Sequence, residues 1–208
     1  MSIRKIVKYG DPILRQKSKE ISKVSKKIKI LAEDMIDTMY ANHGVGLAAV
    51  QVGELLRMFV IDVSDPSEKY NPIVLINPKL IKKDTPVACS EGCLSFPEVF
   101  TDVRRYANVT FKALDMHGRP FIIEGKNGEL LARALQHEYD HLDGIMFIDH
   151  VRNRFDADEK LAEKGLPPVQ PEYLLDEAEM EDVIIANGNK VIDKVDENEE
   201  NTEGEDQQ

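Results

Sequence analysis

The chain has 208 residues, of which 42% are hydrophobic, and a formal net charge of −11 at pH 7. This length and apolar content suffice for one domain with a hydrophobic core. We expect no amino-terminal leader, and the sequence has no apolar run near the roughly 18 residues that cross a membrane. These features argue against a secreted or membrane-spanning protein, and we expect a cytoplasmic one.

The order of the predicted elements indicates an α+β domain. Residues 25–41 have the pattern of a helix, and four later stretches, separated by turn signals such as MHGRP, have the patterns of strands: 57–63, 73–77, 108–115 and 120–125. Few helices intervene between these strands, which favours antiparallel pairing. We therefore predict mostly antiparallel sheets packed around a central helix, which is the histidine-containing helix described below.

A glycine-rich stretch, HGVGLAAVQ, follows the first predicted helix. Gly44 and Gly46 permit unusual backbone angles and the close approach of another chain, as a peptide lying along a strand edge requires. A flexible turn is the alternative interpretation. The stretch is not a dinucleotide-binding fingerprint, because no strand precedes it and the third glycine is absent.

The stretch QHEYDHLDG, residues 136–144, carries two histidines four residues apart. Apolar residues at helical intervals predict a helix over residues 129–144. On that helix His137 and His141 project from the same face and can bind one cation, and Glu138 is available to transfer a proton. His-Glu-x-x-His is typical of zinc peptidases, and ordinary surface or core histidines are the alternative.

Two histidines do not complete a catalytic metal site, which usually has three protein ligands and one open position. The zinc peptidases with an extended motif supply a further histidine downstream, but the corresponding residue here is Phe147. The remaining candidates are a carboxylate, three other histidines and two cysteines: His43, His117, His150, Cys89 and Cys93. The cysteines are close together in a chain for which we expect no leader, so we also expect reduced thiols that are free to bind metal. A small buried hydrophobic role is the alternative.

The last quarter of the chain is strongly acidic. Residues 156–208 contain 18 acidic and 4 basic side chains, whereas residues 1–155 have a net charge of +3. We predict an acidic C-terminal extension over 156–208, with a proline-containing linker at 165–173 and disorder from about residue 196. We also expect residues 171–185 to form a short amphipathic element that packs on its own domain or on a second copy. A solvated tail is the alternative.

Three stretches together resemble the signature motifs of the peptide deformylases, in the same order and at the same spacings: GVGLAAVQVG (44–53), EGCLSFPE (91–98) and QHEYDHLDG (136–144). The amino-terminal YGDPILR is also similar, so the resemblance runs from about residue 3 to about residue 150. It identifies residues 1–155 as the catalytic domain. It implies the predicted α+β fold and a hydrolase that removes the N-formyl group from the initiator methionine of newly made polypeptides, releasing formate.

The resemblance also implies a divalent metal ion. Cys93, His137 and His141 would be its ligands, and Glu138 the general acid and base for a hydroxide formed on the ion. Family members are typically ferrous enzymes, so the resemblance implies Fe²⁺ as the native ion. Zn²⁺ or another divalent ion can replace it in purified protein.

Five further residues receive roles from the resemblance. The side-chain amide of Gln51 and the backbone N–H of Leu94 would form the oxyanion hole. Backbone around Val45, Gly46 and Gly92 would hold the substrate peptide. Local sequence alone favours a surface or loop amide for Gln51.

The implied substrates are N-formylmethionyl nascent peptides. Val99 and Phe100 stand where some family members carry a basic residue, which leaves the preference beyond the first substrate residue open. Many bacterial members end in a basic helix thought to dock on the ribosome. A C-terminal extension of net charge −14 should be repelled by ribosomal RNA, so docking by that route is disfavoured. We expect no membrane association, and the sequence leaves the oligomeric state open.

Two other classes of function remain. A zincin-like metallopeptidase would need a third ligand after the helix, and the absence of a downstream histidine argues against it. A non-catalytic, metal-stabilised binding module would have a closed site with four protein ligands, for which Cys89 beside Cys93 is a candidate.

Overall fold

The computed structural model describes residues 2–174 apart from 66 and 68, together with residues 184 and 185. Its helices are α1 (Lys26–Ala41), α2 (Leu130–His141) and α3 (Arg154–Glu163). Its strands are β1 (Gly46–Ala48), β2 (Met58–Ile61), β3 (Ile73–Cys93), β4 (Phe96–Leu114), β5 (Pro120–Gly125) and β6 (Ile184–Ile185). Within this described part of the chain, the helices are too short or too polar to cross a membrane.

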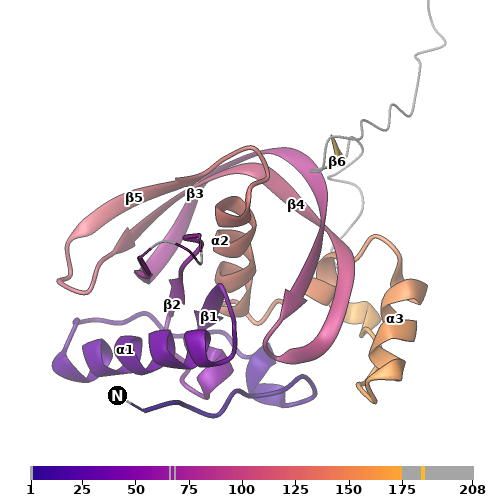
Figure 1. The fold of residues 1–208 in the computed structure, drawn as a ribbon, viewed down its shortest axis with the longest axis horizontal. Helices are drawn as coiled ribbons and strands as arrows, with labels where there is room; N and C mark the ends of the chain where they lie inside the picture. Colours follow the sequence, from indigo (N-terminus) through magenta and orange to yellow (C-terminus); the bar gives the residue numbers. More distant parts are fainter. Residues whose placement is uncertain (1, 66, 68, 175–183, 186–208) are drawn as a thin grey trace, which may run out of the picture.

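Strands β1 to β5 form one antiparallel sheet in chain order, and β6 pairs in parallel with β3. The ladder between the long strands β3 and β4 shifts register near Ile76, near Leu80 and near Gly92. Such bulges bend a sheet, and Figure 1 shows β3 and β4 arching over α2. The predicted α+β fold, with antiparallel strands around the histidine-containing helix, is confirmed.

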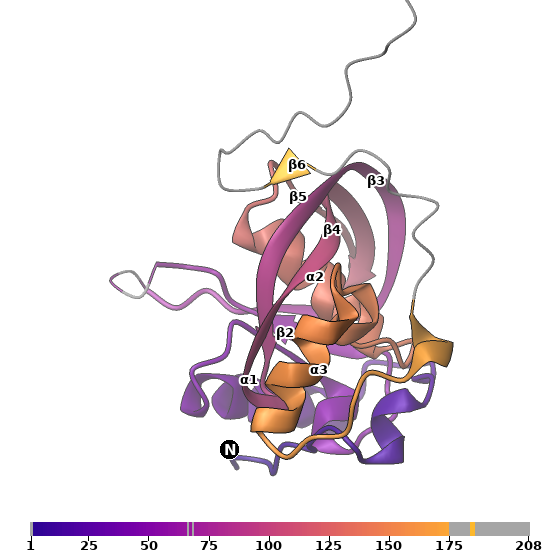
Figure 2. The same ribbon diagram turned by 90° about the vertical axis from the view of Figure 1, so that its right-hand side faces the viewer.

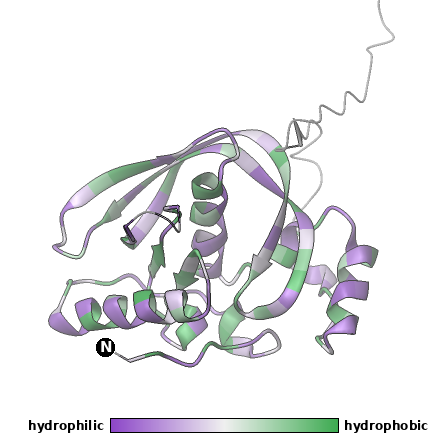
Figure 3. Cartoon of the chain, viewed as in Figure 1, coloured by the Kyte–Doolittle hydropathy of each residue, from purple (hydrophilic) through white to green (hydrophobic). Residues whose placement is uncertain are grey.

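Helix α1 forms where the sequence predicts it and covers one end of the sheet. The Ser25 side chain accepts a hydrogen bond from the backbone N–H of Ile28 and caps the first turn. Leu31, Met35 and Met39 recur at intervals of four residues and are buried in a cluster with residues of β1 and β2. Figure 3 shows the hydrophobic residues of this helix alternating with hydrophilic ones along its length.

Two strands are much longer than the sequence predicts. The stretches 73–77 and 108–115 are only the start of β3 and the end of β4, while 57–63 and 120–125 match β2 and β5 closely. The middle of β3, from Ile81 to Thr85, is largely exposed and charged, so it lacks the alternation that marks a half-buried strand. Its strand conformation depends on pairing with β4, which a single stretch of sequence does not reveal.

Helix α2 is the centre of the domain. Positive φ angles at Asn127 and Gly128 turn the chain before the helix, and Gly144, with φ 75°, ends the segment that follows it. Both histidines of the motif and Glu138 are buried. Polar side chains at such depth are stable only with partners or a bound ion.

The chain beyond residue 155 continues to pack on the domain as far as residue 174. Figure 2 shows α3 on the outer side of the arched strands, where Ala157 and Leu161 are buried. In the segment predicted as a linker, Val169 is 1% exposed, and its N–H donates to Asp158 Oδ1 at 2.7 Å. The division at residue 155 stays a prediction. The amphipathic element predicted at 171–185 falls largely, and the disorder predicted from residue 196 wholly, outside the described residues.

Candidate metal centre and active site

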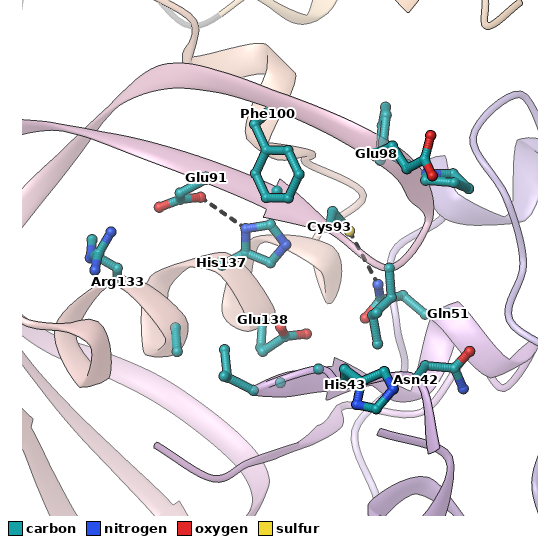
Figure 4. Close-up of a pocket in the computed structure, with 18 of the residues that line it drawn as sticks. Asn42, His43, Gln51, Glu91, Cys93, Glu98, Phe100, Arg133, His137 and Glu138 are labelled. Carbon is teal, nitrogen blue, oxygen red and sulfur yellow. Dashed lines mark hydrogen bonds and ion pairs between the residues drawn. The ribbon is translucent and has the colours of Figure 1, made fainter. Parts of the chain in front are cut away.

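A cavity of about 490 Å³ opens between α2 and the strands β1 and β3. Its lining includes Gly46 of β1, Cys93 of β3, and His137 and Glu138 of α2. Figure 4 shows Cys93, His137 and Glu138 gathered around the cavity. The arch of β3 over α2 therefore brings together three stretches that are far apart in the sequence.

Cys93, His137 and His141 lie close enough to bind one ion. One ligand atom from each lies within 4.8 Å of the others, and within the described residues this is the one such group of three. Cys93 Sγ is 3.3 Å from His141 Nε2. Tetrahedral zinc, with Zn–S near 2.3 Å and Zn–N near 2.0–2.1 Å, would separate two such atoms by about 3.5 Å. The donor set and its spacing fit a divalent cation.

The histidines have the orientations that ligands need. His137 Nδ1 is 2.9 Å from Glu91 Oε2, so its Nδ1–H donates to the carboxylate and Nε2 carries the free lone pair. Burial holds the pKa of His141 well below its usual 6.5, so this imidazole is neutral, as a ligand must be. Burial would also lower the pKa of His137, but Cys93 and Glu91 raise it and so favour a second proton, on Nε2, when no ion is bound. A cation bound at Nε2 would take the place of that proton.

Sequence reasoning missed the residues that hold His137. Arg105 of β4 donates from Nε and Nη2 to Glu91, both at 2.9 Å, and from Nη1 to Asp140. Burial alone would raise the pKa of Glu91, but Arg105 and His137 hold it far below its usual value. Glu91 stands inside the EGCLSFPE stretch, which was the available signal, whereas nothing local in the sequence marks Arg105 as buried.

The other candidate ligands lie outside this group. His150 Nε2 contacts Asp140 Oδ2 at 2.8 Å. His43 lines the cavity mouth, and His117 stands in the turn between β4 and β5. Cys89 Sγ donates to Glu91 Oε1 at 3.7 Å, and burial raises the pKa of its thiol to about 12. The four-ligand site that would include Cys89 is therefore not formed by these side chains.

Glu138 is a buried carboxylate beside the candidate ligands. Its Oε2 has no hydrogen-bond partner, and burial raises its pKa to about 7. A Cβ at residue 46 would overlap Glu138 Oε1, so only glycine at that position leaves room for the carboxylate. A cation held nearby would lower this pKa again, because it favours the charged carboxylate.

Gln51 is buried rather than exposed on a loop, so the local interpretation was wrong. It lies in the short 3-10 helix Ala49–Val52, and its Oε1 accepts the N–H of Ala48 at 2.7 Å. Its Nε2 donates to Cys93 Sγ at 3.3 Å and to Ser95 Oγ at 3.2 Å. The side-chain amide is thus held with its N–H groups toward the candidate ligand.

The remaining residues named from the sequence line the same cavity: Val45, Gly46, Gly92 and Leu94. Gly46 belongs to β1, so this glycine stands in a strand rather than in a flexible turn. At Gly92 a Cβ would meet the Phe100 ring, which lies against the bare backbone at the cavity wall. All nine residues proposed from the sequence except His141 are among those that line the cavity.

Comparison with known proteins extends this resemblance over most of the chain. Residues 3–156 match the family model described as polypeptide deformylase. The chain is 49% identical to a peptide deformylase of Endomicrobium trichonymphae over 151 residues, which covers 73% of this chain and 88% of the relative. It is 50% identical over 147 residues to the peptide deformylase of Dictyoglomus thermophilum, which covers 71% of this chain and 92% of that relative.

Solved structures agree. A peptide deformylase from Synechococcus elongatus in complex with actinonin superposes with a TM-score of 0.73 at 38% identity, over 82% of this chain and 88% of that one. A peptide deformylase from Legionella pneumophila superposes with a TM-score of 0.72 at 40% identity, over 79% of this chain and 96% of that one. The chain therefore belongs to the peptide deformylase family, the metallohydrolases that remove the N-formyl group from newly made polypeptides.

Proposed function

We propose that Cys93, His137 and His141 bind the catalytic divalent ion and that Glu138 transfers the protons of deformylation. The observation that carries this proposal is the grouping of three ligand atoms within 4.8 Å beside a buried carboxylate, Glu138, whose Oε2 has no hydrogen-bond partner. When bound, a divalent cation supplies Lewis acidity, which acidifies water and polarises the formyl carbonyl. The protein residues transfer the protons, stabilise the oxyanion and hold the substrate peptide.

Glu138 acts first as base and then as acid. As a carboxylate it accepts a proton from the attacking water, whose oxygen adds to the formyl carbon. When the C–N bond breaks, Glu138 returns that proton to the departing amine, and formate leaves. Its burial supports this role, because a carboxylic acid with a pKa raised towards 7 can both accept and release a proton near neutral pH.

Gln51 and the backbone N–H of Leu94 stabilise the oxyanion. The Gln51 amide is fixed by Ala48 and Ser95 and lies next to Cys93, so it needs little reorganisation when charge develops on the formyl oxygen. Each donor in such a hole typically lowers the activation barrier by about 3 kcal/mol.

The substrate peptide lies as an extended strand between the backbones near Gly46 and Gly92. Val45 and Gly46 supply backbone groups on one side, and Gly92 supplies them on the other. The methionine side chain occupies the apolar part of the cavity, among Leu130, Ala134 and Phe100. The apolar side chains there suit an unbranched thioether.

We further propose Fe²⁺ as the native ion and the cytoplasm as the compartment. One thiolate and two imidazoles suit either iron or zinc, and the family resemblance favours iron. Both cysteines are free, and the substrates are nascent chains. Docking on the ribosome through the acidic C-terminal extension remains disfavoured by its charge.

The test is formate release from formyl-Met-Ala-Ser by protein purified without air. We expect metal-dependent release that Glu138→Ala abolishes and that Glu159→Ala, an exposed carboxylate on α3, retains. The unformylated peptide is the substrate control. A folded, metal-loaded wild-type protein that released no formate would contradict the proposed site and favour a binding module.

A further inference from the structure

Arg133 lies on the same face of α2 as the candidate ligands. It precedes His137 by four residues, so its side chain projects toward the same cavity one helical turn earlier, and it lines that cavity. Figure 4 shows Arg133 rising from α2 on the side of His137 away from Gln51. None of the roles proposed above uses it.

The guanidinium of Arg133 has no carboxylate partner in the described part of the chain. Its Nη1 donates to the Ser90 carbonyl at 3.4 Å, which is long for a hydrogen bond, and its Nε is buried without a partner. The exposed carboxylate of the cavity wall, Glu98, pairs instead with Lys164 of the segment after α3, at 2.7 Å. Arg133 thus presents an unpaired cation to the cavity.

An extended substrate would bring its third side chain to this cation. The argument rests on the proposed function, in which the methionine side chain enters the cavity. In an extended chain the side chains of residues one and three point to the same side. The third residue therefore follows the methionine toward the wall that carries Arg133. We propose that Arg133 favours N-formylmethionyl peptides with Asp or Glu at the third position.

The experiment compares kcat/KM for three peptides that differ at one residue: formyl-Met-Ala-Glu-Ser, formyl-Met-Ala-Gln-Ser and formyl-Met-Ala-Lys-Ser. All are amidated at the C-terminus, so that no terminal carboxylate imitates the acidic side chain. At low salt we expect glutamate to exceed glutamine by about threefold to fivefold, and lysine to be the poorest. The advantage should shrink at high salt, because exposed charges are screened.

Two variants assign the preference to one residue. Arg133→Met keeps an apolar stem on the cavity wall and should equalise glutamate and glutamine. Arg119→Met removes the same charge from an exposed arginine that pairs with Asp115 outside the cavity, and should keep the preference. A further peptide, formyl-Met-Glu-Ala-Ser amide, tests position and should show no advantage that depends on Arg133.

The outcomes separate the two proposals. Formate from none of the peptides would contradict the proposed active site. Formate from all of them at equal kcat/KM, or a preference that survives in Arg133→Met, would overturn the role of Arg133 and leave the active site standing.

Discussion

Glu91 Oε2 lies 2.9 Å from His137 Nδ1, and two nitrogens of Arg105 hold the same carboxylate. This hydrogen bond fixes both the ring orientation and the tautomer of a candidate metal ligand. Such partners commonly change metal affinity by about 10- to 100-fold when they are lost.

We therefore predict that Glu91→Gln weakens zinc binding by about 10- to 100-fold, because the neutral amide no longer favours the required tautomer. Competition with a chromophoric chelator would measure it. Glu98→Gln, at an exposed carboxylate of the same cavity, serves as the control and should bind zinc normally. Equal affinity of the two variants would show that Glu91 acts only as a counter-ion for Arg105.

Gln51→Ala should lower kcat by about 10²- to 10³-fold with little change in KM, because an oxyanion forms only during the reaction. Steady-state rates on formyl-Met-Ala-Ser would measure both constants. Ser95→Ala, which removes only one hydrogen-bond partner of the Gln51 amide, should have a smaller effect. A Gln51→Ala variant with a raised KM and an unchanged kcat would assign the amide to substrate binding instead.

Asp34 makes stability depend on pH. The backbone N–H of Ser2 and the Arg4 side chain donate to this buried carboxylate and hold its pKa below the usual 3.8. A carboxylate with a lowered pKa stabilises the fold above pH 3.8, and this contribution is lost as the pH falls through the folded-state pKa. Urea unfolding should show Asp34→Asn less stable than wild type by about 1 kcal/mol at pH 7. The difference in the free energy of unfolding between the two proteins should become smaller in acid. The same difference at pH 7 and at pH 3 would contradict the dependence of stability on the ionisation of Asp34.

Leu161 tests whether α3 belongs to the cooperative fold. Its side chain is fully buried, so Leu161→Ala should lower the free energy of unfolding by about 2–5 kcal/mol. Phe155→Ala, on the same helix but 85% exposed, should cost almost nothing. Chemical denaturation of both variants would make the comparison. Equal stabilities would mean that α3 separates from the domain before the rest unfolds.

The sequence predicts those parts of the site that depend on local spacing. A four-residue interval on a helix is enough to bring His137 and His141 to one face, and the helix was predictable from its apolar residues. Cys93 and Gln51 were assigned only through the family resemblance, because their positions depend on how β3 and β1 approach α2. The Arg105 side chain could not be found at all, since its burial results from the bend of β4.

The same limit applies to the C-terminal segment. Charge and proline content distinguish residues 156–208 from the rest of the chain, because most residues of that stretch are polar, charged or proline. Single apolar residues such as Leu161 and Val169 nevertheless anchor its first part against the domain. A composition average conceals them, because a few contacts suffice to hold a short segment in place.

The ion pair between Lys164 and Glu98 joins the segment after α3 to the cavity wall. Lys164 lies beyond residue 156, where the match to the family ends. A change at this lysine would release a negative charge at the entrance while leaving every proposed catalytic residue untouched. If peptides are selected by charge as proposed for Arg133, a substitution at Lys164 would therefore change that selection without altering any residue proposed for the reaction itself.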